Sequence, residues 1–198
     1  MQYLKEEVKI RILEAALQEF KENGYVDASM RTIAHNAGVA LGNVYRYFKN
    51  KDELFNEIME PVHTQLMTVL FDVGKTDDVE QRIQVLYIMD IVEKIMGVFH
   101  KYSTEFIILI DKSRGSKYEN FTEELISLIE NRLKCELVPK FTRIGVEIKD
   151  ELIIYVVASS LVQGMLVILR NCKDEERIKE LMSHLLILYF NDIIERFK

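Results

Sequence analysis

The strongest constraint in this sequence is its helical periodicity, because apolar residues recur at three- and four-residue spacing along most of the chain. Val8, Ile12, Ala16 and Phe20 mark the first such segment, which should stop at the Asn23-Gly24 pair. No segment alternates with period two for long, and Gly and Pro together make only 10 of the 198 residues. This composition disfavours turn-rich β sandwiches and disordered chains. We therefore predict an all-α protein of eight or nine helices.

The boundaries of the later helices follow from capping residues and breaks. Ser29 stands at an N-cap position, and Asn50 with Glu53 resembles a capping box. Pro61 should kink or reset the helix that follows, because it lacks a backbone donor. After the first segment, we expect helices near 29–37, 40–48, 50–70, 78–100, 103–112, 118–137, 150–171 and 174–197, with breaks at 113–117, 139–149 and 171–173.

Two short helices joined at Gly38 form a helix-turn-helix pattern within residues 29–48. Gly38 supplies the backbone freedom that a steep turn between helices requires. The apolar residues of both helices can then pack on the first helix, as Phe48 should, while Gly42 lets the start of the second helix approach a partner closely. Asn43, Tyr45, Arg46 and Tyr47 remain partly or wholly outside, on the element that would enter a DNA major groove. Arg and Asn there suit base edges, whereas Tyr hydroxyls and Lys51 suit phosphates.

Residues 12–59 resemble the DNA-binding domain of the tetracycline-repressor (TetR) family. The resemblance rests on ILEAALQEFKENGY, then on SMRTIAHNAGVALGNVYRYFKNKDELFNEIM, with the spacing A-G-V-x-x-G-x-x-Y-x-Y-F-x-x-K at its centre. It covers about a quarter of the chain. It implies a homodimeric transcription regulator, usually a repressor, with a helix-turn-helix domain over residues 1–51 and a helical effector-binding and dimerisation domain over 52–198.

The resemblance also assigns roles to single residues. It implies that Ser29 and Arg31 lie near DNA at the start of the supporting helix. It implies that a recognition helix near 40–48 turns four residues toward the bases: Leu41, Gly42, Asn43 and Tyr45. Three residues would hold phosphates: Arg46, Tyr47 and Lys51. Arg46 could also reach a base edge, and Tyr45 could pack rather than contact DNA.

Two positions depart from the family pattern. Ala40 stands where Ser or Thr often caps the recognition helix, and Leu41 stands where Lys or Arg is frequent. Loss of a cap typically costs about 1 kcal/mol, and loss of a cation removes one phosphate contact. An apolar Leu41 could instead touch a thymine methyl group. These departures keep open an alternative, in which the protein senses a ligand on the same scaffold without reading an operator tightly.

The charge distribution is consistent with two functions in one chain. The whole sequence has a net charge of −6, which argues against nonspecific coating of nucleic acid. Residues 1–51, however, hold eight Lys and Arg against six Asp and Glu. We therefore expect double-stranded operator DNA to meet this segment, and the acidic remainder to face solvent, a partner subunit and a small ligand.

The remaining helices are rich in apolar side chains. Residues 152–169 contain no charge, and we expect a helix buried on every side. The surplus apolar surface of the last two helices predicts a four-helix homodimer interface, with an unusually apolar monomer core as the alternative. The dimer residues that we select are Leu161, Ile168, Leu181, Leu185 and Tyr189. Ile193, Ile194 and Phe197 should widen the same surface.

An apolar or amphipathic effector is expected in the C-terminal domain. Because Gln163 is an amide within a charge-free helix, it should need a polar partner, and this motivates the candidate pocket. Its residues are Phe99, Phe106, Tyr155, Gln163 and Met165. Effector identity, operator sequence and the direction of regulation are not encoded in these patterns.

No catalytic, metal or cofactor site is expected. The four histidines share no ligand spacing, and Cys135 and Cys172 are too few for a disulfide framework. Gly74-Lys75-Thr76 lacks the first glycine and the preceding strand of a phosphate loop. Residues 152–169 are at the short end of membrane-spanning length, and the charged N-terminus does not resemble a signal peptide. We therefore expect a cytoplasmic protein that is neither an enzyme nor a membrane protein.

Overall fold

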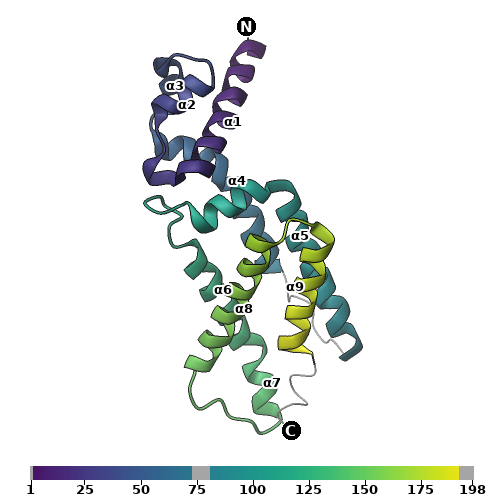
Figure 1. Ribbon diagram of the computed structural model, residues 1–198. Coiled ribbons are helices and arrows are strands. Elements are labelled where there is room, and N and C mark those ends of the chain that lie inside the picture. The colour runs from purple at the N-terminus through teal and green to yellow at the C-terminus, as the bar shows by residue number, and fades with distance from the viewer. Residues whose placement is uncertain (1, 73–80, 192–198) are drawn as a thin grey trace. The chain divides into compact units, whose positions relative to one another are not determined.

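The computed structural model describes residues 2–72 and 81–191, and every regular element within them is a helix (Figure 1). The helix-turn-helix segment contains α2 and α3, between the longer α1 and α4. The described helices are α1 (Gln2–Asp27), α2 (Met30–Asn36), α3 (Leu41–Tyr47), α4 (Lys51–Asp72), α5 (Gln81–Asp111), α6 (Phe121–Glu136), α7 (Val138–Arg143), α8 (Leu152–Asn171) and α9 (Glu175–Phe190). The all-α prediction is thus confirmed. The Gly74-Lys75-Thr76 stretch and Ile193, Ile194 and Phe197 lie outside the described residues.

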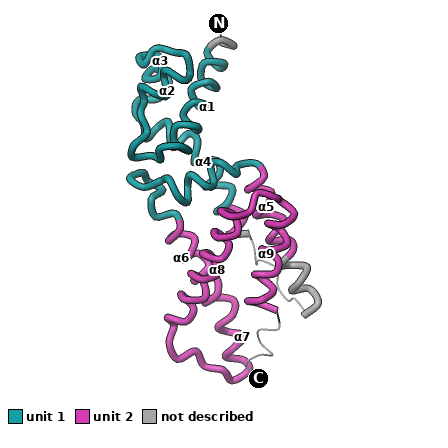
Figure 2. The backbone as a smooth tube through the Cα atoms, in the orientation of Figure 1, with its two compact units in different colours: residues 1–67, 101–121 teal, residues 68–100, 122–198 magenta. Residues whose placement is uncertain are grey.

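The chain divides into two compact units, coloured separately in Figure 2. Unit 1 comprises residues 1–67 and 101–121, and unit 2 comprises residues 68–100 and 122–198. Helices α4 and α5 each contribute to both units. The functional division at residue 51 concerns what each part binds, and it stays a prediction.

Unit 1 is built on a fully buried apolar core. Ile12, Phe20 and Phe55 have no exposed surface, and the Phe20 and Phe55 rings meet edge to face with centroids 4.8 Å apart. Tyr25 packs on the same cluster, 4.9 Å from Phe55 between centroids. Its N–H donates to the Lys112 carbonyl at 2.8 Å, which ties the end of α1 to the 101–121 segment. The helix-turn-helix is therefore joined to a closely packed aromatic cluster within its own unit.

Two expected helix breaks are confirmed as kinks inside longer helices. Gly24 has φ 73°, so α1 is interrupted at the expected C-cap and a further turn runs to Asp27. Tyr102 has φ −135° and ψ 35°, which divides α5 where we expected one helix to end near 100 and the next to begin near 103. Pro61 lies inside α4, which runs from Lys51 to Asp72.

Helix α7 (Val138–Arg143) lies where the sequence predicts a break beginning at Pro139. Proline instead occupies the first turn of α7. Its missing N–H has no intrahelical partner to lose at that position, so proline is well tolerated there. The same residue type can thus begin a helix or end one.

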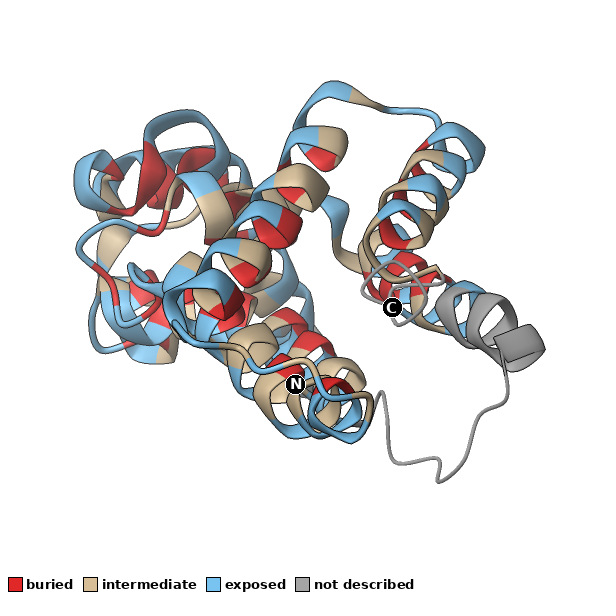
Figure 3. Ribbon diagram, turned by 90° about the horizontal axis from the view of Figure 1, so that it is seen from below, coloured by how far each residue is buried: buried red, intermediate tan, exposed pale blue. Residues whose placement is uncertain are grey.

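In unit 2, α8 packs along α9. A Cβ atom added at Gly164 of α8 would lie 3.0 Å from a Leu185 methyl carbon, so the two helices approach closely there. The expectation that α8 is buried on every side is wrong for the single chain, since Leu152 is 61% exposed and Val167 is 54% exposed. Buried and exposed residues alternate along the helices in Figure 3.

One side of α8 is therefore left open. Its exposed residues follow helical spacing, and we call this set the α8 stripe: Val156, Ser160, Gln163 and Val167. By length and composition alone, α8 could cross a membrane, because its most apolar window has a mean hydropathy of 2.4 and is only 33% buried. The same test is passed by core helices of soluble proteins, so composition does not decide between a membrane and a protein partner.

Candidate nucleic-acid interface

The turn between α2 and α3 has the geometry that the sequence predicts. Gly38 has φ 67°, a left-handed conformation that a Cβ atom disfavours. Its N–H donates to the His35 carbonyl at 3.0 Å, and the Val39 N–H donates to the Ala34 carbonyl at 3.0 Å. These bonds close the end of α2 and direct the chain into α3.

Helix α3 has one buried side and one open side. Val44 is fully buried and Phe48 is 2% exposed, which confirms Phe48 as a core residue. Tyr45 is 47% exposed and Arg46 is also exposed. Of the two alternatives for Tyr45, packing inside the chain is therefore wrong, and contact with DNA stays a prediction.

The start of α3 combines a bare backbone with a weak cap. No atom lies within 4 Å of a Cβ added at Gly42, so this glycine borders open space. Leu41 and Asn43 are half-buried. Ala40 occupies the N-cap and offers no side-chain hydrogen bond, so the orphan N–H groups of the first turn are not capped by a side chain. The Asn43 N–H donates to the Ala40 carbonyl at 2.8 Å, which closes the first turn of α3.

Two of the predicted phosphate contacts already have partners within unit 1. The Lys51 ammonium donates to the carbonyls of Val26 at 2.8 Å and Ala28 at 3.1 Å, and lies 4.8 Å from the centroid of the Tyr25 ring. The Tyr47 hydroxyl donates to the Lys5 carbonyl at 3.0 Å. Lys51 thus binds the carbonyl groups around the α1–α2 junction, and Tyr47 connects α3 to the first turns of α1. The sequence pattern did not indicate either structural contact.

Ser29 caps α2 as expected, with its hydroxyl accepting from the Thr32 N–H at 3.4 Å. Its own N–H donates to the carboxylate of Glu19 at 2.9 Å, and Glu19 is only 4% exposed. Arg31 is exposed in the first turn of α2. Glu19 is a positioning residue that sequence reasoning missed, because its partner is a backbone group ten residues away.

Further polar contacts hold α4 in place beneath the helix-turn-helix. Asn50 caps α4, since its side-chain oxygen accepts from the Glu53 N–H at 2.8 Å. The Glu53 carboxylate accepts from the Lys49 N–H at 2.7 Å, one residue earlier than a capping box requires. The Tyr25 hydroxyl donates to Asp52, and burial together with this bond raises the pKa of Tyr25 to about 12.

The predicted effector residues do not share one compact unit. Phe106 is buried in unit 1, whereas the other four belong to unit 2. Phe99, Tyr155 and Met165 are half-buried there, and Gln163 is exposed. An exposed amide can bind water, so in the single chain Gln163 does not need the polar partner on which the candidate pocket was based. The five residues stay a prediction.

The predicted dimer residues are more buried in the single chain than the α8 stripe is. Leu161 is buried within its own chain, and the remaining four are half-buried: Ile168, Leu181, Leu185 and Tyr189. The open side of α8 is the α8 stripe instead. Within residues 2–72 and 81–191, no group of three or more His, Cys, Asp or Glu side chains could hold a metal ion.

Comparison with known proteins separates the N-terminal part from the rest. Residues 12–58 match the family model described as bacterial regulatory proteins, tetR family. An HTH-type transcriptional regulator of Bacillus subtilis (strain 168) is 49% identical over 47 residues, which is 24% of this chain and 25% of that protein. The chain thus aligns with only a quarter of this curated relative.

Solved structures extend the likeness to nearly the whole fold. A TetR-family regulator from Streptomyces coelicolor A3 has a TM-score of 0.63 at 17% identity, covering 92% of this chain and 90% of that one. The regulator FadR from Bacillus subtilis, solved with stearoyl-CoA, has a TM-score of 0.54 at 17% identity and covers 93% and 98%. The chain therefore has the fold of these regulators, with an N-terminal helix-turn-helix and a larger helical part.

Proposed function

We propose, on the premise that this chain belongs to the TetR family of bacterial regulatory proteins, that it binds a palindromic operator as a homodimer and represses transcription. A small apolar or amphipathic effector bound in the helical part would release it. This role places the protein in the cytoplasm, where it meets double-stranded DNA.

The observation that carries the proposal is the open side of α3. Tyr45 and Arg46 project from a seven-residue helix whose other side is anchored by Val44 and Phe48. A rigid short helix with exposed aromatic and cationic side chains suits a major groove. Gly42 allows the backbone at its start to approach the duplex, because no atom lies within 4 Å of a Cβ added there.

The dimer is supported by the α8 stripe. Val156 and Val167 are about half exposed on a helix that carries no charge between Leu152 and Leu169. Soluble chains rarely leave such a surface open, and a second copy related by a two-fold axis would cover it. The Ser160 hydroxyl, within the stripe, already donates to the carbonyls of Val156 and Val157, so it can be covered without losing its hydrogen bonds. Two reading heads are also what a palindrome requires.

Release by an effector requires that the ligand bind one arrangement of the dimer better than the other. The loss of operator affinity on adding ligand then measures how much more tightly the ligand binds the released arrangement than the DNA-binding arrangement. FadR from Bacillus subtilis was solved with stearoyl-CoA, and this supports an apolar or amphipathic ligand class here.

The experiment that tests the DNA proposal is selection of bound sequences from random duplexes by the full-length protein. A palindromic consensus with half-sites about one helical turn apart, or a multiple of this, would support both operator binding and the dimer. Absence of any enriched sequence at low salt would contradict operator binding. Enrichment of a single half-site would contradict the dimeric arrangement.

A second candidate function is a ligand sensor on the same scaffold that does not read an operator tightly. Three observations favour it: α3 has no side-chain cap, and the Lys51 and Tyr47 donors are used inside unit 1. Titration of a nonspecific duplex at several salt concentrations separates the two functions. An affinity that falls with salt indicates phosphate contacts, whereas no salt-dependent binding favours the sensor.

A further inference from the structure

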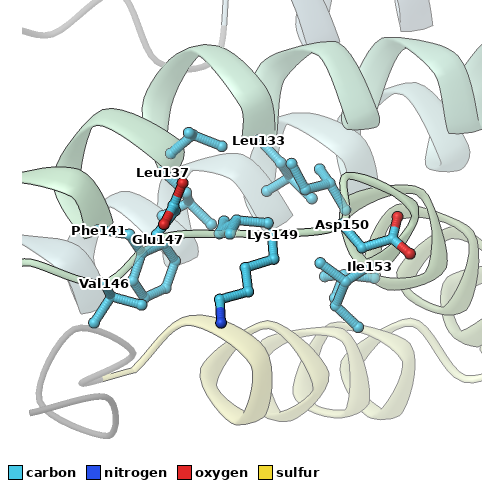
Figure 4. Close-up of a pocket in the computed structure, with 12 residues that line it drawn as sticks. Leu133, Leu137, Phe141, Val146, Glu147, Lys149, Asp150 and Ile153 are labelled. Carbon is cyan, nitrogen blue, oxygen red and sulfur yellow. The ribbon is translucent and has the colours of Figure 1, made fainter.

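Unit 2 contains a pocket of about 350 Å³ that none of the five predicted effector residues lines. Its walls come from the end of α6, from α7, from the connection 144–151 and from the first turns of α8. Figure 4 shows Leu133 and Leu137 on one side, Phe141 with Val146 on another and Ile153 on a third. The volume lies within the range of small-molecule sites, near its lower end.

The connection that forms one wall is held in a defined conformation. Gly145 has φ 80°, and the Val146 N–H donates to the Phe141 carbonyl at 3.0 Å. The chain therefore folds back on α7 and brings Val146 beside the Phe141 ring. This wall can form only because Gly145 adopts the left-handed conformation that lets the chain turn back.

A second set of contacts holds α8 beside α6. The Lys134 ammonium on α6 lies 3.0 Å from carboxylate oxygens of both Glu130 and Glu151. Glu151 immediately precedes α8, so this bridge connects two walls of the pocket. Asp150 accepts from the Leu152 N–H at 2.9 Å and fixes the first turn of α8. These contacts thus connect α6, the connection and the start of α8 around the pocket.

The lining determines which ligand can enter. Leu133, Phe141 and Ile154 are buried and apolar. The charged lining residues, Glu147, Lys149 and Asp150, are all exposed and belong to the connection. A charge moved into the interior would find no partner there, and burial of an unpaired charge is strongly unfavourable. An apolar body can enter, whereas a charged head group has to stay in water at the mouth.

We propose that this pocket binds a medium-length aliphatic ligand, tail first, with its head group outside beside the mixed charges of the connection. The two carboxylates and one ammonium at the mouth give no strong preference for either sign of head charge. The pocket therefore selects by chain length. Any role of this pocket in regulating DNA binding rests on the proposed function. The binding of an aliphatic ligand to the pocket does not depend on that function.

Direct titration of the full-length protein tests this without DNA. Isothermal titration calorimetry measures the affinity on the original protein, so that no lining residue is changed. The probes are octyl, decyl and dodecyl chains, each as a carboxylate and as a trimethylammonium, below their micelle concentrations. Each added methylene should tighten binding about fourfold until the pocket is full. Exchange of the head group should change affinity less than two methylenes do.

Pocket-filling variants locate the binding site, with calorimetry of the decyl probes as the readout. Val157→Phe fills the pocket from α8, and Val146→Phe fills it from the connection, in case the first variant does not fold. Ile144→Phe makes a comparable enlargement on the same connection at a residue that does not line the pocket. At least a tenfold loss of affinity in a folded filling variant, with Ile144→Phe unchanged, is the expected result.

The proposal is overturned if affinity is independent of chain length, if one head charge alone decides binding, or if folded filling variants bind as well as the original protein. These outcomes are distinct from failure of the proposed function. A protein that binds aliphatic probes but no duplex retains the pocket and loses the operator role. If the protein binds an operator but no probe, the operator role is supported and the pocket proposal is overturned.

Discussion

The helix-turn-helix and the α8–α9 pair differ in the kind of side chain that they expose to solvent. Around α3, Val44 and Phe48 are buried and the exposed side carries Tyr45 and Arg46, which have polar groups for a nucleic acid. On α8, the exposed side carries Val156 and Val167, which have none. The exposed side of α3 suits a partner that binds reversibly, such as DNA. The exposed side of α8 suits a permanent partner, such as a second subunit. This difference predicts that DNA binding is salt-sensitive and that the dimer is not.

The largest effect is expected from a charge placed in the α8 stripe. In Val156→Glu, a two-fold axis would bring two carboxylates into one interface, where burial and mutual repulsion disfavour both charges. The dimer dissociation constant should rise at least a hundredfold, and operator affinity should fall with it. Sedimentation equilibrium without detergent measures the change.

The matched control is Ile10→Glu in unit 1, where the original side chain is 49% exposed, compared with 48% for Val156. It should leave the association state unchanged. A monomeric original protein, or a dimer unaffected by Val156→Glu, would show that the α8 stripe has another partner.

The next effect concerns α3. Arg46→Ala should lower operator affinity about tenfold to hundredfold, since a specific charged contact contributes about 1–3 kcal/mol. If Arg46 holds a phosphate, the salt slope should also decrease by about 1 for each copy. Fluorescence anisotropy at several salt concentrations provides both values.

Arg114→Ala removes another exposed arginine of unit 1, from the segment between α5 and α6. It should leave the affinity and the salt slope near the original values. Equal losses in both variants would indicate a general electrostatic attraction rather than reading by α3.

The contrast between the two regions also explains what could be predicted from the sequence. The Ser29 cap and the turn at Gly38 depend on neighbours within a few residues, and the helical period marks Phe48 as a buried position, so all three could be predicted. The contacts of Lys51 with Val26 and Ala28 span more than twenty residues, and periodicity carries no information about them. In the same way, an apolar pattern indicates that α8 avoids water but not what covers it. The pocket was missed because its wall depends on the fold of residues 144–151.

A smaller effect distinguishes the two glycines of the helix-turn-helix. Gly38→Ala should destabilise unit 1 by about 1–2 kcal/mol, because the residue keeps a left-handed conformation. Gly42→Ala adds a methyl group in open space within a helix, so it should stabilise the free protein by up to about 1 kcal/mol. Urea unfolding measures both changes.

If α3 enters the major groove as proposed, Gly42→Ala should nevertheless weaken operator binding, because the added methyl group would separate the backbone of α3 from the duplex. A gain in stability together with a loss of affinity would separate the DNA-facing role of this residue from any role in folding. Unchanged affinity would indicate that the start of α3 does not approach DNA closely.

The smallest effect concerns the ion pair that links α4 to the 101–121 segment of unit 1. Lys117 lies 2.6 Å from the Glu60 carboxylate and, mainly through this hydrogen bond, holds the pKa of Glu60 below its ordinary value. Both side chains are about half exposed, so Glu60→Gln should cost less than about 1 kcal/mol at pH 7. Because the folded-state pKa is the lower one, this stabilisation is present above the unfolded-state pKa and is lost as the pH falls through the folded-state value. The stability gap between the original protein and Glu60→Gln should therefore close in acid, and unfolding curves from pH 7 to pH 3 measure it.

Glu14→Gln, at an exposed position on α1, should show no such gap. A gap that persists at pH 3 would mean that the amide changes packing around Tyr118, whose hydroxyl also donates to Glu60 at 3.2 Å, rather than the charge on α4.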